Sequence, residues 1–315
     1  MRCGAAGGAA QAAACRACRG PVVKVDGDVS IILPAKNEAP SLARLLPALR
    51  EAYPQAEVLV VDDGSSDETA NLCEAHGVRC VRRPYSMGNG AAVKLGAAAA
   101  RGSVLVFLDA DGQHDPRDIP QLLQPLEKGY DMVVGARTPD SHASPGRRLA
   151  NGLYNGLASW ITGRAIRDLT SGFRTVRAAK FRQFLFMLPN GFSYPTTCTM
   201  AFFRSGYPVA YVPIRAERRE GRSHLNVLRD GVRFLLIIFR ITTLYSPLKL
   251  FFPLAAMTFL VSVGYYLYTY ATIGRFTNMG ALLFITSVVI FLMGLLSEQI
   301  TMLVYQRTHA DEDSG

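Results

Sequence analysis

The sequence predicts an α/β fold with a mostly parallel sheet, followed by two membrane-spanning helices. The first observation is that short apolar runs alternate with segments of helical periodicity between residues 29 and 135. This alternation is typical of parallel strands joined by right-handed crossovers, with helices on both faces of the sheet. The second is that hydrophobic residues make up 49% of the chain, more than is usual for a soluble enzyme, and that this excess lies after about Phe234. Phe251–Ile273 and Gly280–Tyr305 are each long enough to cross a bilayer.

Each predicted strand or helix follows from local hydrophobic periodicity and from capping residues and prolines. The run of five apolar residues Val104–Leu108 indicates a strand buried on both faces, as in parallel sheets. Ser41 can cap one helix and Asp67 or Ser66 another, and Pro116 suits a first helical turn. The strands are expected at 29–34, 58–61, 78–81, 104–108, 131–135 and 209–214, and the helices at 41–53, 67–75, 90–100, 116–128 and, with a basic start, 140–165.

Polar side chains follow four of these strands. They are Asn37 and Glu38, Asp62 and Asp63, Asp109 and Asp111, and Arg137. Because ligands bind outside the carboxyl ends of parallel strands, four such clusters predict one site. Asp109 and Asp111 flank a small residue, so in extended backbone both carboxylates project the same way and suit Mg²⁺ or Mn²⁺. Viewed alone, this Asp-Ala-Asp-Gly sequence is equally consistent with a solvated turn that ends the strand.

Charge and cysteine content restrict the partners. A net charge of +9 favours an anionic partner such as a nucleotide, a lipid phosphate or a membrane surface. The basic residues stand singly or in pairs without interleaved aromatics, which argues against nucleic acid. Only Cys15 and Cys18 of the six cysteines have ligand-like spacing, and no second pair completes a zinc site. Nothing indicates a disulfide framework, so a reducing compartment fits.

The chain is expected to divide into five segments. They are a disordered leader (1–27), the α/β domain (28–226), interfacial amphipathic helices (227–250), two transmembrane helices (251–306) and a cytoplasmic tail (307–315). The interfacial assignment rests on Arg229, Arg233 and Arg240, which recur about one helical face apart in an apolar segment. These residues, with Lys249 before the first span and Arg307 after the second, place the α/β domain in the cytoplasm beside the cell membrane.

The two apolar stretches carry one acidic residue and two glycines of interest. Glu298 lies near the far end of the second span, close to the membrane interface, where the free-energy cost of a charged side chain is smallest. Gly264 and Gly294 would allow close packing against neighbouring spans, which leaves room for a homo-oligomer. A buried helical hairpin in a soluble protein is the alternative, and two apolar stretches of this length with a single charged residue between them argue against it.

A membrane anchor on a metal-binding domain suggests that one substrate resides in the bilayer. A cation beside carboxylates favours a diphosphate, because the cation offsets charge on a departing nucleoside diphosphate. A lipid phosphate acceptor is largely ionised at neutral pH, which explains the absence of an obvious catalytic histidine or Ser-His pair. Arg137, Arg147 or Arg174 would hold this acceptor in line. The basic loop from Arg218 to His224 suits diphosphate oxygens, or is simply a solvated loop.

Several motifs resemble a known family. The segments 31–38 (IILPAKNE), 60–69 (VVDDGSSDET) and 109–116 (DADGQHDP) resemble family-two glycosyltransferases of the GT-A fold. The segments 135–137, 170–174 and 218–226 are similar to polyprenyl-phosphate hexosyltransferases of the dolichol-phosphate mannose synthase type. The two-span tail looks like that of the bacterial membrane members. The resemblance covers about residues 29 to 305 and implies a GT-A nucleotide-sugar-binding domain.

The resemblance also implies roles for individual residues. The nucleotide sugar would contact Pro34, Ala35, Glu38, Asp62, Asp63, Asp109, Asp111, Gln113, Arg218 and His224; the metal would contact Asp109, Asp111 and Gln113; and the acceptor phosphate would contact Arg137, Arg147, Ser171 and Arg174. The first aspartate of the Asp62–Asp63 pair would hold the nucleoside, and Asp111 and Arg137 are the catalytic candidates. Two positions depart from the family, which often has lysine at His224 and at Asn89.

The predicted function is the metal-dependent, inverting transfer of a hexose from a nucleotide sugar to a polyprenyl phosphate at the cytoplasmic face. One alternative is a processive polysaccharide synthase, which resembles this chain in its first domain but needs a Gln-x-x-Arg-Trp motif. The single tryptophan, Trp160, follows Leu-Ala-Ser, so that motif is absent. Another is a non-catalytic nucleotide-sugar or lipid-phosphate binding subunit of a membrane assembly, against which the intact Asp109, Asp111 and Gln113 set argues.

Overall fold

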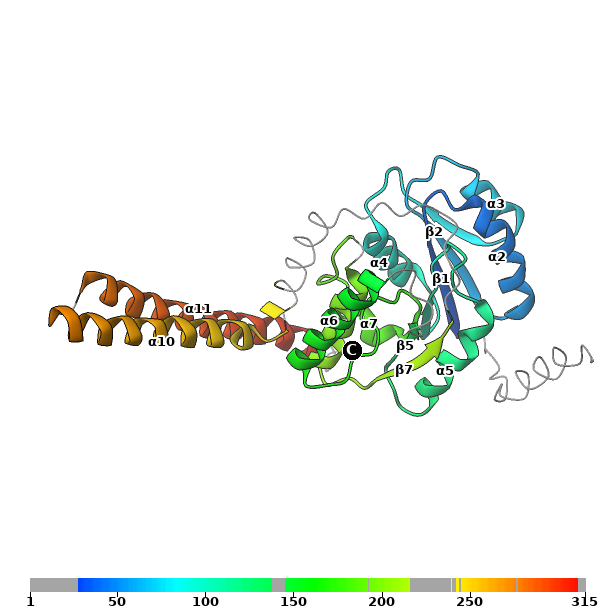
Figure 1. Cartoon of the computed structure of the whole chain (residues 1–315). Coiled ribbons are helices and arrows are strands. Elements are labelled where there is room, and N and C mark those ends of the chain that lie inside the picture. Colours follow the sequence, from blue (N-terminus) through cyan, green and yellow to red (C-terminus); the bar gives the residue numbers. More distant parts are fainter. Residues whose placement is uncertain are drawn as a thin grey trace, which may run out of the picture.

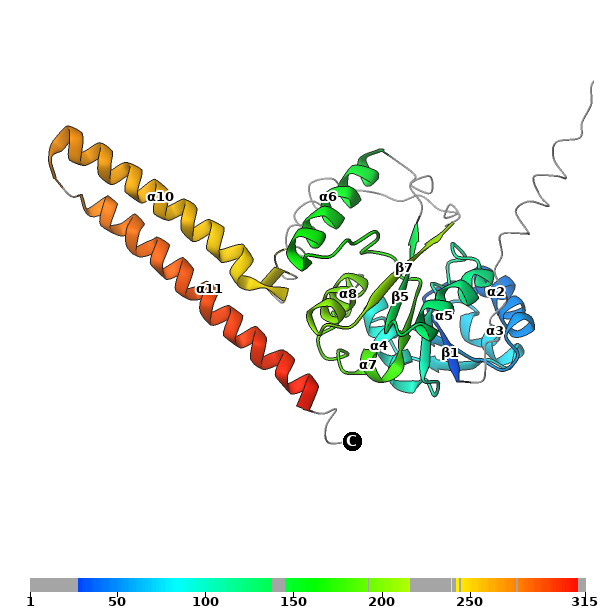
Figure 2. The ribbon, with the colours of Figure 1, turned by 90° about the horizontal axis from the view of Figure 1, so that it is seen from below.

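The computed structural model describes residues 28–137, 145–191, 193–215, 239, 242–243, 245–275 and 277–310. It has an α/β domain from which a hairpin of two long helices projects (Figures 1 and 2). The predicted leader, the basic loop with Arg218 and His224, and most of the predicted interfacial segment lie outside the described residues.

The described residues form a seven-stranded mixed sheet in the order β3-β2-β1-β4-β6-β5-β7. The strands are β1 (Val29–Ala35), β2 (Glu57–Asp62), β3 (Arg79–Arg82), β4 (Val104–Phe107), β5 (Met132–Arg137), β6 (Arg174–Arg177) and β7 (Val209–Ile214). All six predicted strands are present, and the mostly parallel sheet is confirmed. Strand β6 was not predicted. It runs antiparallel between β4 and β5, and its charged ends, Arg174 and Arg177, conceal it in the sequence.

Helices cover both faces of the sheet, as predicted (Figure 1). On one face lie α2 (Ala39–Ala52), α3 (Thr69–Ala75) and α5 (Ile119–Glu127), the last preceded by a 3-10 turn (Pro116–Asp118); on the other lie α4 (Asn89–Ala99), α7 (Ala178–Arg182) and α8 (Tyr194–Arg204). Leu42, Leu46 and Leu49 of α2 are fully buried, so the apolar stripe of that helix faces the sheet. This packing encloses one apolar core on each face of the sheet, and the two cores hold the strand ends in place.

A further helix, α6 (Pro145–Thr162), packs outside α8 rather than on the sheet. Tyr154, Ala158 and Ile161 of α6 are buried against Met200 of α8. The predicted amphipathic helix at 140–165 is therefore present over most of its length. Its position joins the α/β domain to the base of the helical hairpin (Figure 2).

The hairpin consists of α10 (Pro247–Ile273) and α11 (Asn278–Ala310). The stretches Pro247–Thr272 and Asn278–Leu303 are long and apolar enough to cross a membrane. Only 11% and 17% of the residues in their most apolar windows are buried. Such exposed apolar surface is unlike the buried core hairpin of a soluble protein and is suited to lipid.

The two glycines predicted to pack against neighbouring spans differ in their surroundings. A Cβ on Gly294 would lie 2.7 Å from the Cβ of Phe251, so this glycine lets α11 approach α10 within the hairpin. A Cβ on Gly264 would have no other atom within 4 Å among the described residues. Close packing at Gly294 is therefore used inside one chain.

This difference provides a matched pair of variants. Gly294→Ala is expected to destabilise the hairpin by about 1–3 kcal/mol, because the new methyl overlaps Phe251 and the helices must separate. Gly264→Ala is expected to be neutral or slightly stabilising, since alanine has the higher helix propensity. Thermal unfolding of the full chain in detergent measures both. An equal shift of the two midpoints would contradict the assigned contact.

Candidate functional site

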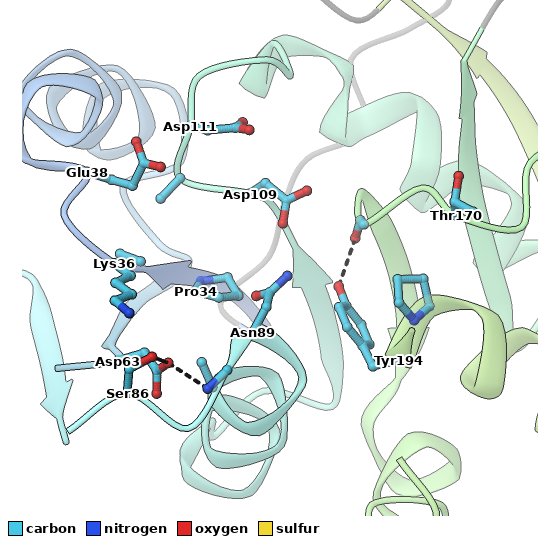
Figure 3. A pocket seen from close by; sticks show the side chains of 16 residues that line it. Pro34, Lys36, Glu38, Asp63, Ser86, Asn89, Asp109, Asp111, Thr170 and Tyr194 are labelled. Atoms are coloured by element: carbon cyan, nitrogen blue, oxygen red, sulfur yellow. Dashed lines mark hydrogen bonds between the residues drawn. The ribbon is translucent and has the colours of Figure 1, made fainter. Parts of the chain in front are cut away.

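A cleft of about 420 Å³ lies at the carboxyl edge of the sheet. It is lined by Pro34, Ala35, Lys36, Glu38, Asp63, Ser86, Gly88, Asn89, Ala92, Asp109, Ala110, Asp111, Thr170, Gly172, Tyr194 and Pro195 (Figure 3). The predicted clusters after β1, β2 and β4 therefore meet there. The loop before β6 and the start of α8 complete the cleft.

Asp109 and Asp111 lie on the segment that leaves β4, with both carboxylates pointing to the same side (Figure 3). A Cβ on Gly172 would lie 2.5 Å from Oδ2 of Asp109, so a larger residue at this position would displace the carboxylate. Oδ1 of Asp111 accepts the backbone N–H of Gln113 at 3.2 Å. Gly112 has a φ of +74° between these residues, a conformation that suits glycine and turns the chain behind Asp111.

These donors fit a hard divalent cation. Both are carboxylate oxygens, which Mg²⁺ and Mn²⁺ prefer to nitrogen or sulfur ligands. Within the described ranges, no group of three or more His, Cys, Asp or Glu residues could enclose a metal. Asp109 and Asp111 would therefore hold a cation together with oxygens of a bound ligand, as Mg²⁺ sites with one or two carboxylates commonly do. Gln113 does not line the cleft, and its described contact is the backbone bond to Asp111.

The two aspartates after β2 have different roles. Asp62 is fully buried, and its Oδ1 accepts the backbone N–H of Ser65 at 2.7 Å, which holds the turn. Asp63 lines the cleft instead. The implied contact of Asp62 with a nucleoside is therefore wrong for this conformation, because its side chain turns inward while that of Asp63 turns toward the cleft.

Asp63 in turn fixes the loop before α4. Its carboxylate accepts the Ser86 hydroxyl at 2.7 Å and the backbone N–H groups of Met87 and Gly88 at 3.0 and 2.8 Å. Burial alone would raise the pKa of Asp63, but these hydrogen bonds and the nearby Arg83 outweigh it and lower the pKa below the ordinary value. An ionised Asp63 thus shapes one wall of the cleft at neutral pH.

Arg137, at the end of β5, is held by Asp168. Its Nε and Nη2 donate to the two carboxylate oxygens at 2.8 and 3.0 Å, a bidentate pair, and Nη2 also donates to Oγ1 of Thr170. Burial opposes both charges, yet the pair lowers the pKa of Asp168 and raises that of Arg137. The side chain of Arg137 remains 27% exposed, so this fixed cation is accessible beside the cleft.

The other acceptor candidates do not all reach this region. Arg174 is fully buried; its Nη1 donates to the Pro195 carbonyl at 3.0 Å and its Nη2 to the Ser171 carbonyl. The predicted phosphate contact of Arg174 is therefore wrong, because β6 directs the side chain into the core beneath α8. The Oγ of Ser171 is buried and has no partner among the described residues. Arg147 lies in α6, but its side chain is not described.

His114 lies behind the aspartate pair. Its ring packs against Phe173 with centroids 5.1 Å apart. Burial lowers the pKa of His114 to about 4, although Asp111 and Asp168 oppose this shift. The imidazole is therefore neutral at pH 7 and adds no positive charge beside Asp111.

Sequence reasoning missed several residues of the site. Lys36 and Asn89 line the cleft. Lys36 directly precedes the predicted Asn37–Glu38 cluster, so adjacency could have identified it, whereas Asn89 follows none of the predicted polar strand ends. Asp168 begins the segment that contains Ser171 and Arg174, but only tertiary structure pairs it with Arg137, 31 residues earlier. Tyr194 carries no local signal, since it enters the cleft only because α8 starts there; its hydroxyl donates to the Gly172 carbonyl at 3.5 Å.

Comparison with known proteins identifies the family. Residues 30–204 match the family model described as glycosyl transferase family 2. The chain belongs to this family. Residues 246–303 match a second model, the GtrB C-terminal hairpin, and so agree with α10 and α11. The predicted membership of family two is thereby confirmed, and the protein is a glycosyltransferase.

Several curated proteins are similar to this chain. Glycosyltransferase AglJ of Haloferax volcanii is 30% identical over 249 residues, covering 76% of this chain and 80% of the relative. Polyprenol monophosphomannose synthase of Mycolicibacterium smegmatis is 31% identical and covers 60% and 77%. Undecaprenyl-phosphate mannosyltransferase of Micrococcus luteus is 32% identical and covers 65% and 94%.

A solved structure confirms the GT-A fold of this family-two domain. It is glucosyl-3-phosphoglycerate synthase from Mycobacterium tuberculosis in complex with Mn²⁺, uridine diphosphate and phosphoglyceric acid. The TM-score is 0.57 at 21% identity, with 71% of this chain and 84% of the synthase covered. At this identity the similarity concerns the fold alone.

The structural role of Arg174 can be tested by its removal. Arg174→Ala is expected to lower the free energy of unfolding by about 3 kcal/mol or more, because buried carbonyls lose their donor and a cavity forms. Arg167→Ala, at an exposed arginine nearby, is the control and should have little effect. Thermal unfolding in detergent compares them. A fully stable Arg174→Ala variant with weakened acceptor binding would restore the original interpretation.

Proposed function

We propose that this family-two glycosyltransferase transfers a hexose from a nucleotide sugar of the GDP-mannose or UDP-glucose type to a polyprenyl phosphate. The reaction inverts the anomeric carbon, requires Mg²⁺ or Mn²⁺ and takes place at the cytoplasmic face of the cell membrane. The observation that carries the proposal is the arrangement of Asp109, Asp111 and the fixed Arg137 at one sheet edge, in a domain attached to an apolar hairpin.

The chemistry of the cleft supports this reaction. An oxygen of the acceptor phosphate attacks the anomeric carbon while the bond to the nucleoside diphosphate breaks. The second pKa of a phosphate monoester is about 6, so the acceptor is mostly ionised at pH 7 and needs little help from a base. A bound divalent cation would offset charge on the leaving diphosphate. Arg137, oriented by Asp168, would hold the acceptor phosphate in line.

The relatives support the choice of substrates. Two of them are named as a polyprenol monophosphomannose synthase and an undecaprenyl-phosphate mannosyltransferase, which supports a polyprenyl phosphate acceptor. A structural neighbour contains Mn²⁺ and uridine diphosphate, which supports a metal and a nucleotide donor. Basic residues beside the apolar stretches support a cytoplasmic domain and two spans.

The proposal is tested by transfer of radiolabelled sugar from a panel of nucleotide sugars into an organic-extractable lipid, with Mg²⁺ or Mn²⁺ present. Asp111→Asn is expected to lower this transfer by about 100-fold or more, because the cation loses a charged ligand. Membrane insertion should not change.

Asp115→Asn is the control for this variant, since Asp115 follows the same strand but pairs with Arg117 outside the cleft. Transfer retained by Asp111→Asn would exclude the metal assignment. No transfer by the wild-type protein from any common nucleotide sugar, despite nucleotide binding, would favour a binding subunit instead.

Arg137→Ala tests the acceptor side. The variant is expected to raise KM for polyprenyl phosphate by about tenfold, a loss typical of one charged hydrogen-bonding contact, with a much smaller change in donor KM. Arg167→Ala again serves as an exposed control. Steady-state kinetics with each substrate varied in turn measure both constants. An effect confined to the donor would contradict the proposed placement of Arg137.

A further inference from the structure

One acidic residue in the hairpin connects three helices. Oε1 of Glu298 in α11 accepts a hydrogen bond from Nη2 of Arg204, the last residue of α8, at 3.0 Å. Its Oε2 accepts the backbone N–H of Leu248 at 3.3 Å, in the first turn of α10. The two charged side chains are only 14% and 22% exposed. A single carboxylate thus joins the hairpin to the α/β domain and satisfies one free amide at the start of α10.

Other contacts surround this ion pair. The guanidinium of Arg204 lies 5.8 Å from the ring centroid of Tyr245, whose hydroxyl donates to the Thr162 carbonyl at 3.4 Å. Nζ of Lys249 donates to the Ile161 carbonyl at 2.7 Å. The end of α6 therefore meets the start of α10 beside the pair. Because these contacts come from different elements, the base of the hairpin has a defined seat on the domain.

The hairpin itself is closely packed at the same level. Gly294 lies about one helical turn before Glu298, and a side chain there would overlap Phe251 and approach Leu248. This close approach brings α11 near enough to α10 for Glu298 to reach the Leu248 amide. The position of Glu298 is thus set by packing on one side and by Arg204 on the other.

The hydrogen bond from the Leu248 amide does not explain why residue 298 is charged, because burying a charge costs free energy. Glu298 is the one acidic residue between 247 and 303, the two stretches apolar enough to span a membrane. A carboxylate at the edge of a bilayer is unfavourable unless it is paired, and a neutral glutamine oxygen could also accept the Leu248 amide. The ion pair with Arg204 is what requires an acid at this position.

Helix α8 connects the Glu298–Arg204 ion pair to the cleft. Tyr194 and Pro195, in its first turn, line the cleft, and Arg204 ends the helix at the hairpin. The buried guanidinium of Arg174 holds the first half of α8, through the Pro195 carbonyl and Oγ1 of Thr199, to β6. Because this α-helix of 11 residues is fixed at both ends, it behaves as a short rigid rod between the cleft and the hairpin. The cleft and the hairpin are therefore held at a set separation.

We propose that the Glu298–Arg204 ion pair is a positioning device that sets the cleft at the height over the bilayer from which a lipid-borne phosphate reaches Arg137. The inference rests on the proposed function, because it assumes an acceptor anchored in the membrane. Without the pair, the hairpin remains inserted but the domain tilts on its base. Acceptors presented from the bilayer then meet the cleft less often, whereas acceptors free in water are unaffected.

The test compares two acceptors in one full-length protein reconstituted in vesicles. With long-chain polyprenyl phosphate in the bilayer, Glu298→Gln is expected to raise the acceptor KM by about tenfold while the donor KM stays within about twofold of the wild type. With a short, water-soluble isoprenyl phosphate, the same variant should match the wild type. Gln299→Ala, at the adjacent exposed residue, is the matched control and should behave as the wild type with both acceptors.

A charge exchange checks that the pair, and not one residue, is responsible. Each single variant is expected to raise KM for the lipid acceptor. The double variant Arg204→Glu with Glu298→Arg should have a KM between those of the single variants and the wild type, since the ion pair re-forms but the Leu248 amide loses its acceptor. The proposal would be overturned if Glu298→Gln had the wild-type KM for the lipid acceptor, or if its KM rose equally for the lipid and the water-soluble acceptor. Failure of the wild-type protein to transfer sugar to either acceptor would instead overturn the proposed function.

Discussion

The guanidinium of Arg174 lies where the sheet, the cleft and the helix toward the hairpin meet. Its hydrogen bonds to the Ser171 and Pro195 carbonyls join the loop before β6 to the start of α8. A buried arginine without such partners would be strongly destabilising, so these carbonyls must remain in place while the charge is buried. That requirement fixes Gly172 against Asp109 and holds Tyr194 and Pro195 at the cleft wall.

The charges around the cleft are arranged in complementary sets. Asp109 and Asp111 offer oxygen ligands on one side, and the Arg137–Asp168 pair places an oriented cation beside them. The ionised carboxylate of Asp63 is held by three hydrogen-bond donors and lies near Arg83, so its charge supports a loop and competes little for a metal. His114 stays neutral behind the aspartates. Such separation of anionic and cationic groups suits a diphosphate and a phosphate bound side by side.

The hairpin combines a large apolar surface with one acidic residue, Glu298, and each needs a different environment. The exposed apolar residues of α10 and α11 suit a lipid environment, and Glu298 is satisfied by Arg204 and the Leu248 amide at the boundary with the domain. The same contacts make α8 a direct connection between hairpin and cleft. The apolar hairpin and the geometry of the site are thus parts of one structure.

The sequence by itself determined the elements whose signals are local. The parallel strands, the two apolar helices and the Asp109–Asp111 pair follow from periodicity, length and spacing, because neighbouring residues alone decide them. Only the tertiary structure decided which charges face the cleft. Antiparallel insertion of β6 between β4 and β5 buries Arg174, and pairing across 31 residues joins Asp168 to Arg137. These outcomes depend on contacts between distant segments, which no local pattern encodes.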